Sequence, residues 1–414
     1  MPPLERLFLA RQPILDAGGA LIGYELLFRD SATNRADAVI PGIATADVVC
    51  KAFTELGLSS ALGGHRAFII ADAEFLRHEA IEALPAHGVV LEVDAALAGV
   101  PDVLERCVAL GSKGYTFCLM NLQELDESIA ALLKLSGYIK LNINACDASL
   151  LKRLLALPSE FRPVTIASHV ETKADYQNAS ALGFHFFQGY YFAEPTVVEG
   201  RRVDPSMQGL VHIINLLNRD AELAEIEQAF KSEAALTVKL LRLTNSAGVG
   251  LRIRIGSVRQ AISVIGRFHI QRWLQLLLYS QSGGDDITRN PLMQYAALKG
   301  CFMERLARRG FSAQGNLADL AFLAGLMSLM PAALGMPMAD ILDQMAMAPQ
   351  LRDALLQREG DLGALLELTD CFDNDDPDGV EAALARLDHG VGRDALNICL
   401  AEAIGWVQSL ATEA

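Results

Sequence analysis

The sequence predicts two domains of different class: an α/β domain over residues 1–200 that forms a TIM-like (β/α) barrel, and an all-α domain over residues 201–414. Three observations lead to this prediction. The length of 414 residues exceeds that of one ordinary domain. Up to Phe192, short apolar runs of strand length alternate with helical stretches, a pattern typical of a parallel sheet covered by helices. After Pro205, only helical spacing of apolar residues remains.

Apolar runs of strand length recur through the first domain, and their number favours a closed barrel over an open sheet. The candidate strands are Leu7–Ala10, Ile22–Phe28, Ala67–Ala71, Val89–Val93, Tyr115–Met120, Tyr138–Leu141, Val164–Ala167 and Phe184–Phe187. Candidate helices between them include Thr45–Glu55, Asp102–Leu110, Leu122–Leu135, Ala148–Leu157 and Lys173–Leu182. Because the chemistry of such barrels lies at the C-terminal ends of the strands, we expect functional side chains there. These ends hold Glu25, Glu92, Met120, Lys140 and Gln188.

The second half reads as helix throughout, with Gly or Pro between many of the helices. The candidates are Ser206–Leu217, Leu223–Lys231, Ala234–Thr244, Ser257–Ile265, Ile270–Tyr279, Met293–Arg308, Asn316–Leu329, Met338–Met345, Pro349–Leu356, Gly360–Asp370 and Gly379–Leu387. This pattern predicts an all-helical domain that begins after the proline-containing segment Glu194–Pro205.

Composition excludes several classes of function. The net charge of −15 disfavours nucleic acid and anionic membranes as partners. Charged residues interrupt the apolar runs before the roughly 20 residues of a membrane span, and no basic segment leads into an apolar core at the N-terminus. We therefore expect a cytoplasmic protein. The seven cysteines form no Cys-x-x-Cys pair, which predicts small buried hydrophobes rather than disulfides or zinc ligands.

Two segments of the first domain carry a family resemblance. Residues 22–29 read Ile-Gly-Tyr-Glu-Leu-Leu-Phe-Arg, and residues 186–195 read Phe-Phe-Gln-Gly-Tyr-Tyr-Phe-Ala-Glu-Pro. They resemble the first and last signature segments of EAL domains, the bacterial phosphodiesterases that open cyclic di-GMP. The region from Ala10 to Pro195 is similar in order and spacing to a divergent branch in which the motif reads Glu-Leu-Leu-x-Arg. The resemblance implies an EAL-type barrel.

The resemblance assigns family roles to five retained residues. Glu25 falls on the metal-binding glutamate, and Arg29 on the arginine that contacts the dinucleotide phosphate. Glu92 falls on the first glutamate of Glu-x-Thr-Glu. Lys140 falls on the lysine that steadies the attacking water, and Gln188 on the glutamine before Gly-Tyr. If the nucleotide binds, the resemblance implies that Arg29, Glu25 and Gln188 contact it.

The same comparison implies that metal ligands have been lost. The Asp-Asp pair reads Met120-Asn121, and a thioether cannot replace a carboxylate on Mg²⁺ or Mn²⁺. Ala71 takes the place of the metal-binding asparagine of the third strand. The Ala-Glu-Gly-Val-Glu-Thr segment has Ser168 for its first glutamate and keeps Glu171 as its second. The other departures are Ala95 for the second glutamate of Glu-x-Thr-Glu, His169 for a glycine, and Asn142 for the aspartate after the lysine.

Two-metal phosphodiester hydrolysis depends on closely spaced ions held by carboxylates. We therefore expect no catalytic residue, no metal and no cofactor, with the retained positions vestigial. Two other roles stay open for the survivors. Glu25 and Lys140 can form a buried ion pair while Arg29 caps a helix or binds a carbonyl, or the site can bind a ligand without cleaving it. His169 is expected to be hydrogen-bonded rather than a metal ligand.

The second domain resembles the HDOD domain, a helical module related to HD-type metal-dependent phosphohydrolases. The similar segments are Val238–Ala247, Ile255–Gly266 and Ala321–Leu329. The metal-binding His-Asp pair of a working HD enzyme reads Ser328-Leu329 here, and the helix at 293–309 contains no histidine. Because an HD site needs several converging ligands, we expect a metal-free module that binds partners.

Three features of this domain have simple interpretations beside functional ones. Five arginines form either an anion-binding patch or solvated helix faces. The run Asp373–Gly379 resembles a calcium loop but has Ala385 where the bidentate Glu is required, which favours a solvated loop before a helix. Methionines in Met327–Met347 either fill gaps in the core or line a partner groove. The arginines are Arg252, Arg254, Arg259, Arg267 and Arg272.

The sequence thus predicts a catalytically inactive signal-transduction protein related to cyclic di-GMP signalling. We expect it to act through protein–protein interaction, with a signalling protein or a second copy as the partner. One alternative is a receptor that binds cyclic di-GMP without hydrolysis. Another is a residual phosphodiesterase that uses Glu25, Glu92 and Glu171 around one ion.

Overall fold

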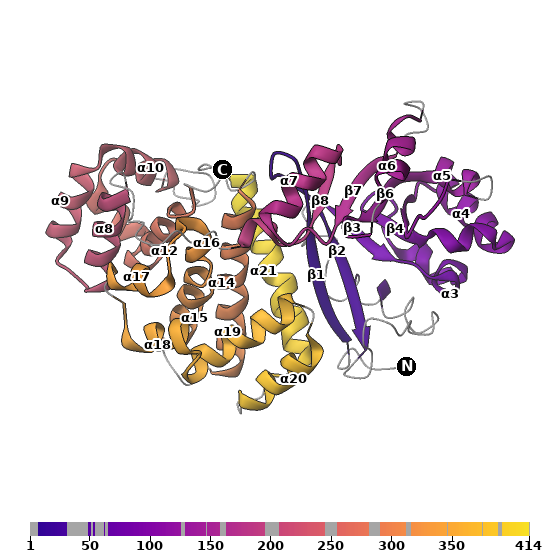
Figure 1. Cartoon of the computed structure of the whole chain (residues 1–414). Helices are drawn as coiled ribbons and strands as arrows, with labels where there is room; N and C mark the ends of the chain where they lie inside the picture. Colours follow the sequence, from indigo (N-terminus) through magenta and orange to yellow (C-terminus); the bar gives the residue numbers. More distant parts are fainter. Residues whose placement is uncertain are drawn as a thin grey trace. The chain divides into compact units, whose positions relative to one another are not determined.

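The structure is a computed structural model that describes most of the chain. The chain consists of two compact units (Figure 1). One consists of Met1–Glu194 with Asp370–Gly405, and the other of Pro195–Thr369 with Trp406–Ala414. The predicted domain boundary at residue 200 lies outside the described residues. The described ranges are 7–30, 49–50, 53, 62, 65–125, 129–145, 147–157, 163–194, 207–244, 255–280, 290–311, 316–345, 347–374, 376–387 and 391–413.

The first unit contains a closed barrel in which the strands follow one another in chain order, so the predicted barrel is confirmed. The strands are β1 (Leu7–Asp16), β2 (Leu21–Asp30), β3 (Arg66–Ile70), β4 (Val89–Asp94), β5 (Thr116–Met120), β6 (Ser136–Asn142), β7 (Val164–Ser168) and β8 (Phe186–Gln188).

The first strand departs from the all-parallel arrangement that the sequence suggests. β1 pairs antiparallel with both β2 and β8, whereas the pairs from β2 to β8 are parallel. The reason is the short connection between β1 and β2, because a parallel crossover needs a dozen or more residues. Asp16 Oδ1 accepts hydrogen bonds from the backbone N–H groups of Gly18 and Ala20, each at 2.8 Å, and so stabilises the hairpin turn.

Helical segments follow the strands. They are α3 (Ala73–Arg77), η2 (Glu79–Ala83), η3 (Ala95–Gly99), α4 (Pro101–Ser112), α5 (Ala130–Leu135), α6 (Ala148–Leu155), α7 (Lys173–Leu182) and η5 (Tyr191–Ala193). The predicted helix Leu122–Leu135 is wrong in its first part, since the helix begins at Ala130 and residues 122–125 are not helical. Most of the predicted helix Thr45–Glu55 lies outside the described residues. α7 begins with a capping box between Thr172 and Asp175.

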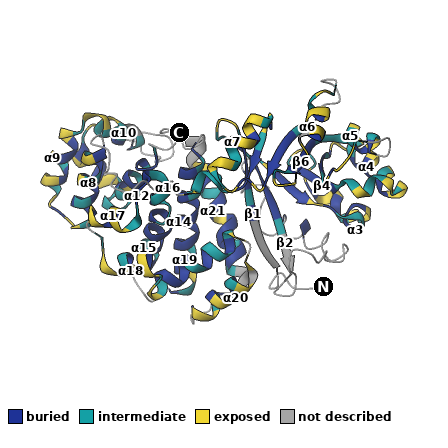
Figure 2. Ribbon diagram, viewed as in Figure 1, coloured by how far each residue is buried: buried dark blue, intermediate teal, exposed yellow. Residues whose placement is uncertain are grey.

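An apolar layer fills the interior of the barrel below the polar strand ends. Its members come from alternate strand positions that point inward, and the barrel strands are among the most buried elements in Figure 2. Phe68 and Tyr138 meet edge to face at 5.3 Å in this layer. The layer consists of Ile14, Phe68, Val90, Cys118, Tyr138 and Ile166.

The rest of the described chain is helical, which confirms the predicted all-α class. The helices are α8 (Gln208–Asn218), α9 (Leu223–Ser232), α10 (Ala234–Thr244), α11 (Val258–Ile265), α12 (Arg267–Leu277), α14 (Pro291–Gly310), α15 (Leu317–Met327), α16 (Met330–Leu334), α17 (Met338–Asp343), α18 (Pro349–Gln357), α19 (Gly360–Asp373), α20 (Pro377–Arg386) and α21 (Arg393–Glu413). α14 and α15 approach closely at glycines, since a Cβ on Gly325 would lie 2.8 Å from the carbonyl oxygen of Lys299.

One apolar stretch is longer than the sequence analysis recognised. Within the described residues, Leu317–Leu334 is long and apolar enough to cross a membrane by length and composition, and Asp319 is its single charge. In the structure this stretch forms α15 and α16, and 56% of it is buried inside the protein. A core helix of a globular domain meets the same criteria, so the stretch is weak evidence for a span.

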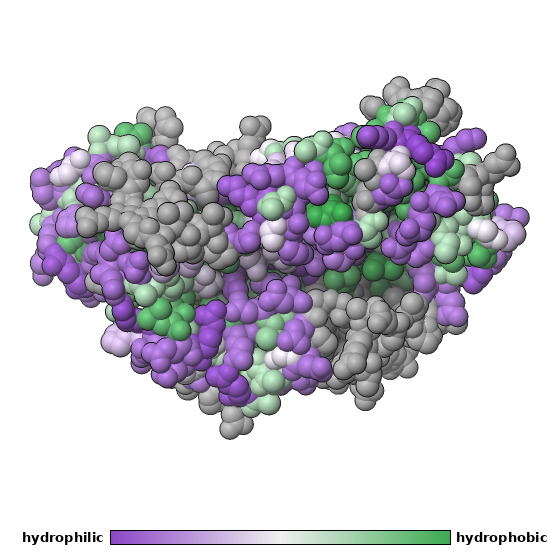
Figure 3. Space-filling view, viewed as in Figure 1, coloured by the Kyte–Doolittle hydropathy of each residue, from purple (hydrophilic) through white to green (hydrophobic). Residues whose placement is uncertain are grey.

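The exposed large hydrophobic side chains are few and dispersed. On the face shown in Figure 3, hydrophilic residues predominate and the apolar ones form small patches. Scattered exposed apolar side chains are normal on globular proteins and do not mark a docking surface. Among the described residues they are Ile70, Val108, Val238, Val264 and Leu356.

Candidate functional site

A polar cluster lies directly above the apolar layer inside the barrel. In a strand ladder, residues that pair directly point to the same face of the sheet. Gln12 pairs with Glu25, and Gln188 pairs with Ile14 of the apolar layer. Glu92 pairs with Cys118, which also belongs to that layer, and Lys140 lies two residues after Tyr138. All of these side chains therefore point into the barrel. We call Gln12, Glu25, Glu92, Lys140 and Gln188 the barrel cluster.

Lys140 holds the cluster together by pairing with two carboxylates. Its Nζ lies 3.0 Å from Oε2 of Glu25 and 2.7 Å from each carboxylate oxygen of Glu92. The hydrogen-bond geometry is good to Oε2 of Glu92. All three side chains are buried, with at most 8% of each exposed. Glu25 and Lys140 thus form the buried ion pair that was one interpretation of the sequence, and Glu92 joins them.

The two carboxyl groups of the cluster have different pKa values. Burial and the neighbouring Glu25 carboxylate raise the pKa of Glu92 to about 8. Burial alone would raise the pKa of Glu25, but the charge of Lys140 and hydrogen bonds from Lys140, Glu92 and Gln188 hold that pKa below its usual value. Burial opposes the charge on Lys140, yet the two carboxylates raise the lysine pKa. At neutral pH the trio therefore carries one proton on Glu92 and no net charge.

Gln188 connects the end of the barrel to its beginning. Its Nε2 donates a hydrogen bond to Oε1 of Gln12 at 2.8 Å and another to Oε2 of Glu25. Gln12 was not identified from the sequence. The sequence did contain a signal for it: Gln12 is a polar residue two positions before the buried Ile14, so both side chains face the interior of the barrel.

The rim above the cluster is largely uncharged. Met120 pairs with Lys140 on the neighbouring strand, and Ser168 pairs with Asn142. On β3, the residue that pairs with Glu92 is Ile70, so Ile70 faces the barrel interior and its neighbour Ala71 faces away. This register corrects the assignment of Ala71 to the position of the lost ligand. Ile70 is 44% exposed at the mouth, whereas Ala71 is buried.

The other residues that the family resemblance singled out make local contacts. Asn121 has a φ of 55° and donates from Nδ2 to Oδ2 of Asp94 at 2.8 Å. His169 has a φ of 62°, and its Nδ1 lies 3.3 Å from Oγ of Ser168, so this histidine is hydrogen-bonded as expected. Glu171 is exposed, and its backbone N–H donates to Asp175 at the start of α7. Among the described residues, Glu171 makes no hydrogen bond to the barrel cluster.

The arginine assigned to phosphate contact is only partly described. The backbone of Arg29 belongs to β2 and pairs with Phe8 of β1. Its side chain lies outside the described part of the structure, so its predicted role in ligand binding stays a prediction.

The barrel cluster does not fit a divalent ion. Mg²⁺ and Mn²⁺ prefer several oxygen ligands, of which carboxylates are the strongest. Here Glu25 and Glu92 both face the Lys140 ammonium, and the neighbouring rim positions are Ile70 and Met120. Within the described ranges, no group of three or more His, Cys, Asp or Glu side chains has a metal-binding arrangement.

The position of the HD metal pair in the helical region is also occupied by non-ligands. Ser328 follows α15, and its Oγ donates to the carbonyl oxygen of Gly325 at 2.7 Å. The segment that resembled a calcium loop begins a helix, since Asp376 Oδ1 accepts the backbone N–H of Gly379 at 3.0 Å and caps α20.

The arginines of the helical region are engaged by carboxylates. Arg259 pairs with Glu227, and Arg267 pairs with Asp220, each at 2.9 Å. Arg272 forms a two-point contact with Glu304. These pairs support the interpretation of solvated or paired helix faces over an anion-binding patch. Arg252 and Arg254 lie outside the described residues.

Arg272 and Glu304 form a largely buried charge pair in the helical region. Arg272 Nη1 and Nη2 donate to the two carboxylate oxygens of Glu304 at 3.2 and 2.7 Å. The guanidinium carbon lies 3.4 Å from the ring centre of Phe322. Burial opposes the charge on Glu304, but the hydrogen bonds and charges of Arg272 and Arg308 lower its pKa. The pair joins α12 to α14 within this region.

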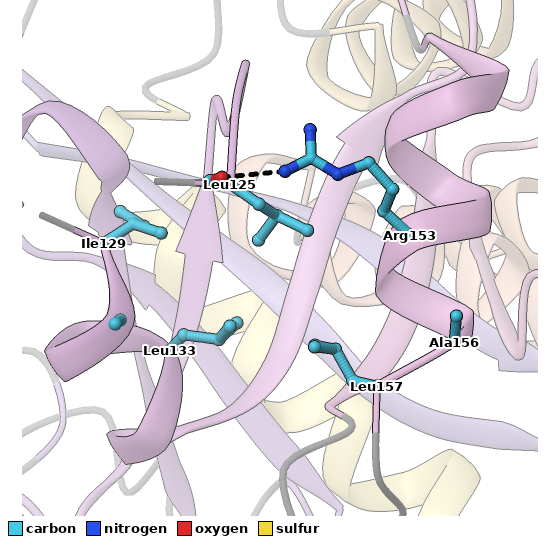
Figure 4. Close-up of a pocket in the computed structure, with 7 residues that line it drawn as sticks. Leu125, Ile129, Leu133, Arg153, Ala156 and Leu157 are labelled. Carbon is cyan, nitrogen blue, oxygen red and sulfur yellow. Dashed lines mark hydrogen bonds between the residues drawn. The ribbon is translucent and has the colours of Figure 1, made fainter. Parts of the chain in front are cut away.

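The barrel unit also has a groove among its helices, and no residue of the barrel cluster lines it. It lies between α5 and α6, with a volume of about 400 Å³ (Figure 4). Arg153 of α6 crosses its edge and donates from Nη2 to the carbonyl oxygen of Leu125 at 2.8 Å. The lining residues are Leu125, Ile129, Ala130, Leu133, Arg153, Ala156 and Leu157.

Known proteins similar to this chain agree with the two domains. Residues 66–195 match the EAL domain family model, and residues 205–340 match the HDOD domain family model. The uncharacterized protein YuxH of Bacillus subtilis is 25% identical over 411 residues, covering 98% of this chain and 99% of YuxH. The cyclic di-GMP phosphodiesterase CdgJ of Vibrio cholerae is 28% identical over 416 residues, covering 97% of this chain and 93% of CdgJ.

Solved structures are more distant. The Bacillus subtilis YkuI protein, which has an EAL domain and was solved with cyclic di-GMP and calcium, is 16% identical with a TM-score of 0.38. The match covers 64% of this chain and 72% of YkuI.

Proposed function

Because this chain is an EAL-HDOD protein, with an EAL domain followed by an HDOD domain, we propose that it transmits a signal without hydrolysing cyclic di-GMP. It acts by binding a protein partner, either another signalling protein or a second copy of itself. The relationship to CdgJ connects the chain to cyclic di-GMP signalling. Inactivity and partner binding are the parts of the proposal that experiments must test.

The observation that carries the proposal is the pairing of Lys140 with both Glu25 and Glu92. Hydrolysis by two metal ions requires carboxylates that are free to bridge them, and water activated between them. In this barrel the Glu25 carboxylate is ion-paired with Lys140, and the carboxyl group of Glu92 contacts the same ammonium. The adjoining rim residues Ile70 and Met120 offer no hard oxygen ligand. These features support the proposal that the site does not activate water through bound metal.

The helical region supports a role in protein contacts. Its counterpart of the HD pair is Ser328-Leu329, and Ser328 donates its hydroxyl to a helix carbonyl. A helical module without catalytic ligands can act by binding other molecules through its surface. We place the protein in the cytoplasm, since the one apolar stretch of spanning length is 56% buried within the described structure.

The test is incubation of full-length protein with cyclic di-GMP in Mg²⁺ or Mn²⁺, followed by chromatography of the nucleotide. We expect intact cyclic di-GMP at high enzyme concentration and long times. Linear product that appears with wild type and disappears with Glu25→Ala would overturn the proposal. Affinity capture with the full chain then tests partner binding, and light scattering tests self-association. If neither a partner nor a second copy binds, the interaction part of the proposal fails.

A second candidate is a residual phosphodiesterase, which the name of CdgJ favours because that protein aligns with this chain over nearly its whole length. The same chromatography decides between the two functions. Turnover in Mn²⁺ that depends on Glu25 would establish it. An absence of product from wild type would exclude it.

The third candidate is a receptor that binds cyclic di-GMP without cleavage, with Arg29 on the phosphate. It predicts a calorimetric titration with measurable heat in wild type that is lost in Arg29→Ala. Arg77→Ala is the matched control, because Arg77 is a half-exposed arginine of the same barrel unit that pairs with Asp102. A flat titration of the wild type excludes the receptor.

A further inference from the structure

The outer face of the first two barrel strands is buried, although no helix connects these strands. Gln12 and Ile14 point into the barrel, so the alternate positions of β1 point away from it. In a (β/α) barrel, the helices that connect the strands cover this outer face. β1 and β2 are joined by a hairpin, so their outer face needs another cover. The outward side chains, each at most 5% exposed, are Arg11, Leu15, Tyr24 and Leu26.

A distant part of the chain belongs to the same compact unit as these strands. It consists of residues Asp370–Gly405, which we call the C-terminal segment. The segment contains the end of α19, the whole of α20 and the first part of α21. It lies outside the HDOD match, which ends at residue 340, and β1 and β2 lie outside the EAL match, which begins at residue 66. Two parts of the chain that neither family model covers are therefore members of one unit.

Tyr190, at the start of η5, links the C-terminal segment to β1. Its hydroxyl donates to the carbonyl oxygen of Arg11 at 2.9 Å. Burial raises the pKa of Tyr190, and the negative charge of Asp373 in α19 raises it more than that of Glu171 does. The positive charge of Arg11 opposes this rise. Charges from α19 and from β1 thus act on the same buried hydroxyl.

Arg11 is a buried cation whose charge is poorly compensated within the barrel. Its guanidinium carbon lies 4.8 Å from the ring centre of Tyr24. Among the described residues, its Nε has no hydrogen-bond partner. A buried positive charge is costly unless a negative charge lies near it. Asp373 is the carboxylate that the C-terminal segment supplies on this side of the barrel.

We propose that the C-terminal segment is a docked cover of the barrel, which packs on the outer face of β1 and β2 and is anchored by Asp373 beside Arg11 and Tyr190. α19 begins at Gly360 and α21 ends at Glu413, so both helices continue into the other unit. A partner that displaces either helix would therefore loosen these barrel strands. The inference goes beyond the proposed function and does not rest on it, because it holds whether or not the barrel hydrolyses cyclic di-GMP.

The test is hydrogen exchange of the full-length protein, followed by mass spectrometry of peptides, in wild type and Asp373→Lys. The lysine places a second positive charge near Arg11, so the cover should loosen. We expect peptides from β1 and β2 to exchange at least about tenfold faster than in wild type, and peptides from α8 to change less than about twofold. Unchanged exchange in β1 and β2, with faster exchange confined to α19 and α20, would overturn the inference.

The matched control is Asp378→Lys. Asp378 lies in the first turn of α20 in the same segment, and its side chain is exposed. The change of charge is the same, but we expect β1 and β2 to exchange as in wild type. Equal acceleration of these strands by both substitutions would show that Asp373 is not an anchor, and the inference would fail.

Asp373→Asn is a milder variant for the case in which lysine prevents folding, and the same peptides decide the outcome. Its combination with Arg11→Met tests the anchor. If the two charges act on each other, Asp373→Asn should accelerate exchange of β1 and β2 more in the wild-type background than in the Arg11→Met background. Equal acceleration in both backgrounds contradicts the anchor at Arg11. No acceleration in either background contradicts the cover itself.

Discussion

The barrel and the helical region each bury a charge pair, but they compensate the charge differently. In the barrel, one lysine faces two carboxylates, and Glu92 is neutralised by a proton. In the helical region, one arginine faces one carboxylate through two hydrogen bonds and stacks on an aromatic ring. Arg308 adds a contact to Glu304 from a largely exposed position.

This difference shows how the choice of cation sets the properties of a buried site. The guanidinium is planar and lies edge to edge with a carboxylate, so two parallel hydrogen bonds satisfy both carboxylate oxygens. An ammonium is a compact point charge with three donors, and it can bridge carboxylates from separate strands. The helical pair is therefore suited to joining two helices. The barrel cluster depends on the balance of charge and protons among several side chains.

The largest effect is expected from Lys140→Met. Loss of the ammonium leaves Glu25 as an uncompensated buried carboxylate, which typically costs about 3–5 kcal/mol in the free energy of unfolding. Urea denaturation at neutral pH in EDTA measures the change. Lys140→Arg is the control, because it keeps the positive charge but changes the shape of the side chain. A midpoint equal to that of wild type would show that the barrel cluster contributes little to stability.

Arg272→Ala should have the next largest effect. The substitution removes the two-point contact and the stacking on Phe322, but Arg308 still pairs with Glu304. We therefore expect a loss of about 2–3 kcal/mol in the free energy of unfolding, below the cost of a fully uncompensated charge. Denaturation followed by tryptophan fluorescence is suitable, because Trp406 lies near the guanidinium. Arg272→Lys should recover part of the loss, and full recovery would mean that the planar fork is unimportant.

Glu92→Gln tests the proton in the barrel cluster. The folded pKa of about 8 lies above the unfolded value of about 4.3, so the folded state binds the extra proton between these pH values. Wild-type stability should fall as pH rises through this window, and Glu92→Gln should flatten that part of the profile. At pH 6 the two proteins should differ by less than about 1 kcal/mol, because the amide resembles the protonated acid. Parallel profiles of stability against pH would contradict the protonated state.

The smallest effect is expected from Lys113→Met. Its ion pair with Glu82 is as short as the pair of Lys140 with Glu92, but water screens it. The urea midpoint should match that of wild type within error. A clear loss of stability would show that burial does not explain the large effect at Lys140.

The sequence predicted the barrel because strand-length apolar runs alternated with helices, and it predicted Glu25, Glu92, Lys140 and Gln188 as one site because strand ends of a barrel converge. It did not predict that β1 is antiparallel, although Asp16–Gly19 is a strong turn signal. The role of Ile70 also escaped prediction. An apolar residue in place of a ligand has no chemical signature, and only the pairing of Ile70 with Glu92 reveals which neighbour faces the interior.

The helical pair escaped prediction for a different reason. Arg272 and Glu304 are 32 residues apart on separate helices, so neither periodicity nor local motif connects them. The arginine was visible only as one member of a basic group. Contacts that depend on how helices pack cannot be obtained from the pattern within each helix.

The contact of Gln188 with Gln12 and Glu25 has a consequence for the order of folding. It joins residues separated by 176 and 163 positions, so it forms only when the last strand reaches the first two. The barrel cannot close before β8 has been synthesised, because β8 pairs with both β1 and β7. Closing a loop of this length costs entropy before the contact stabilises the chain, so closure of the barrel is expected to be slow.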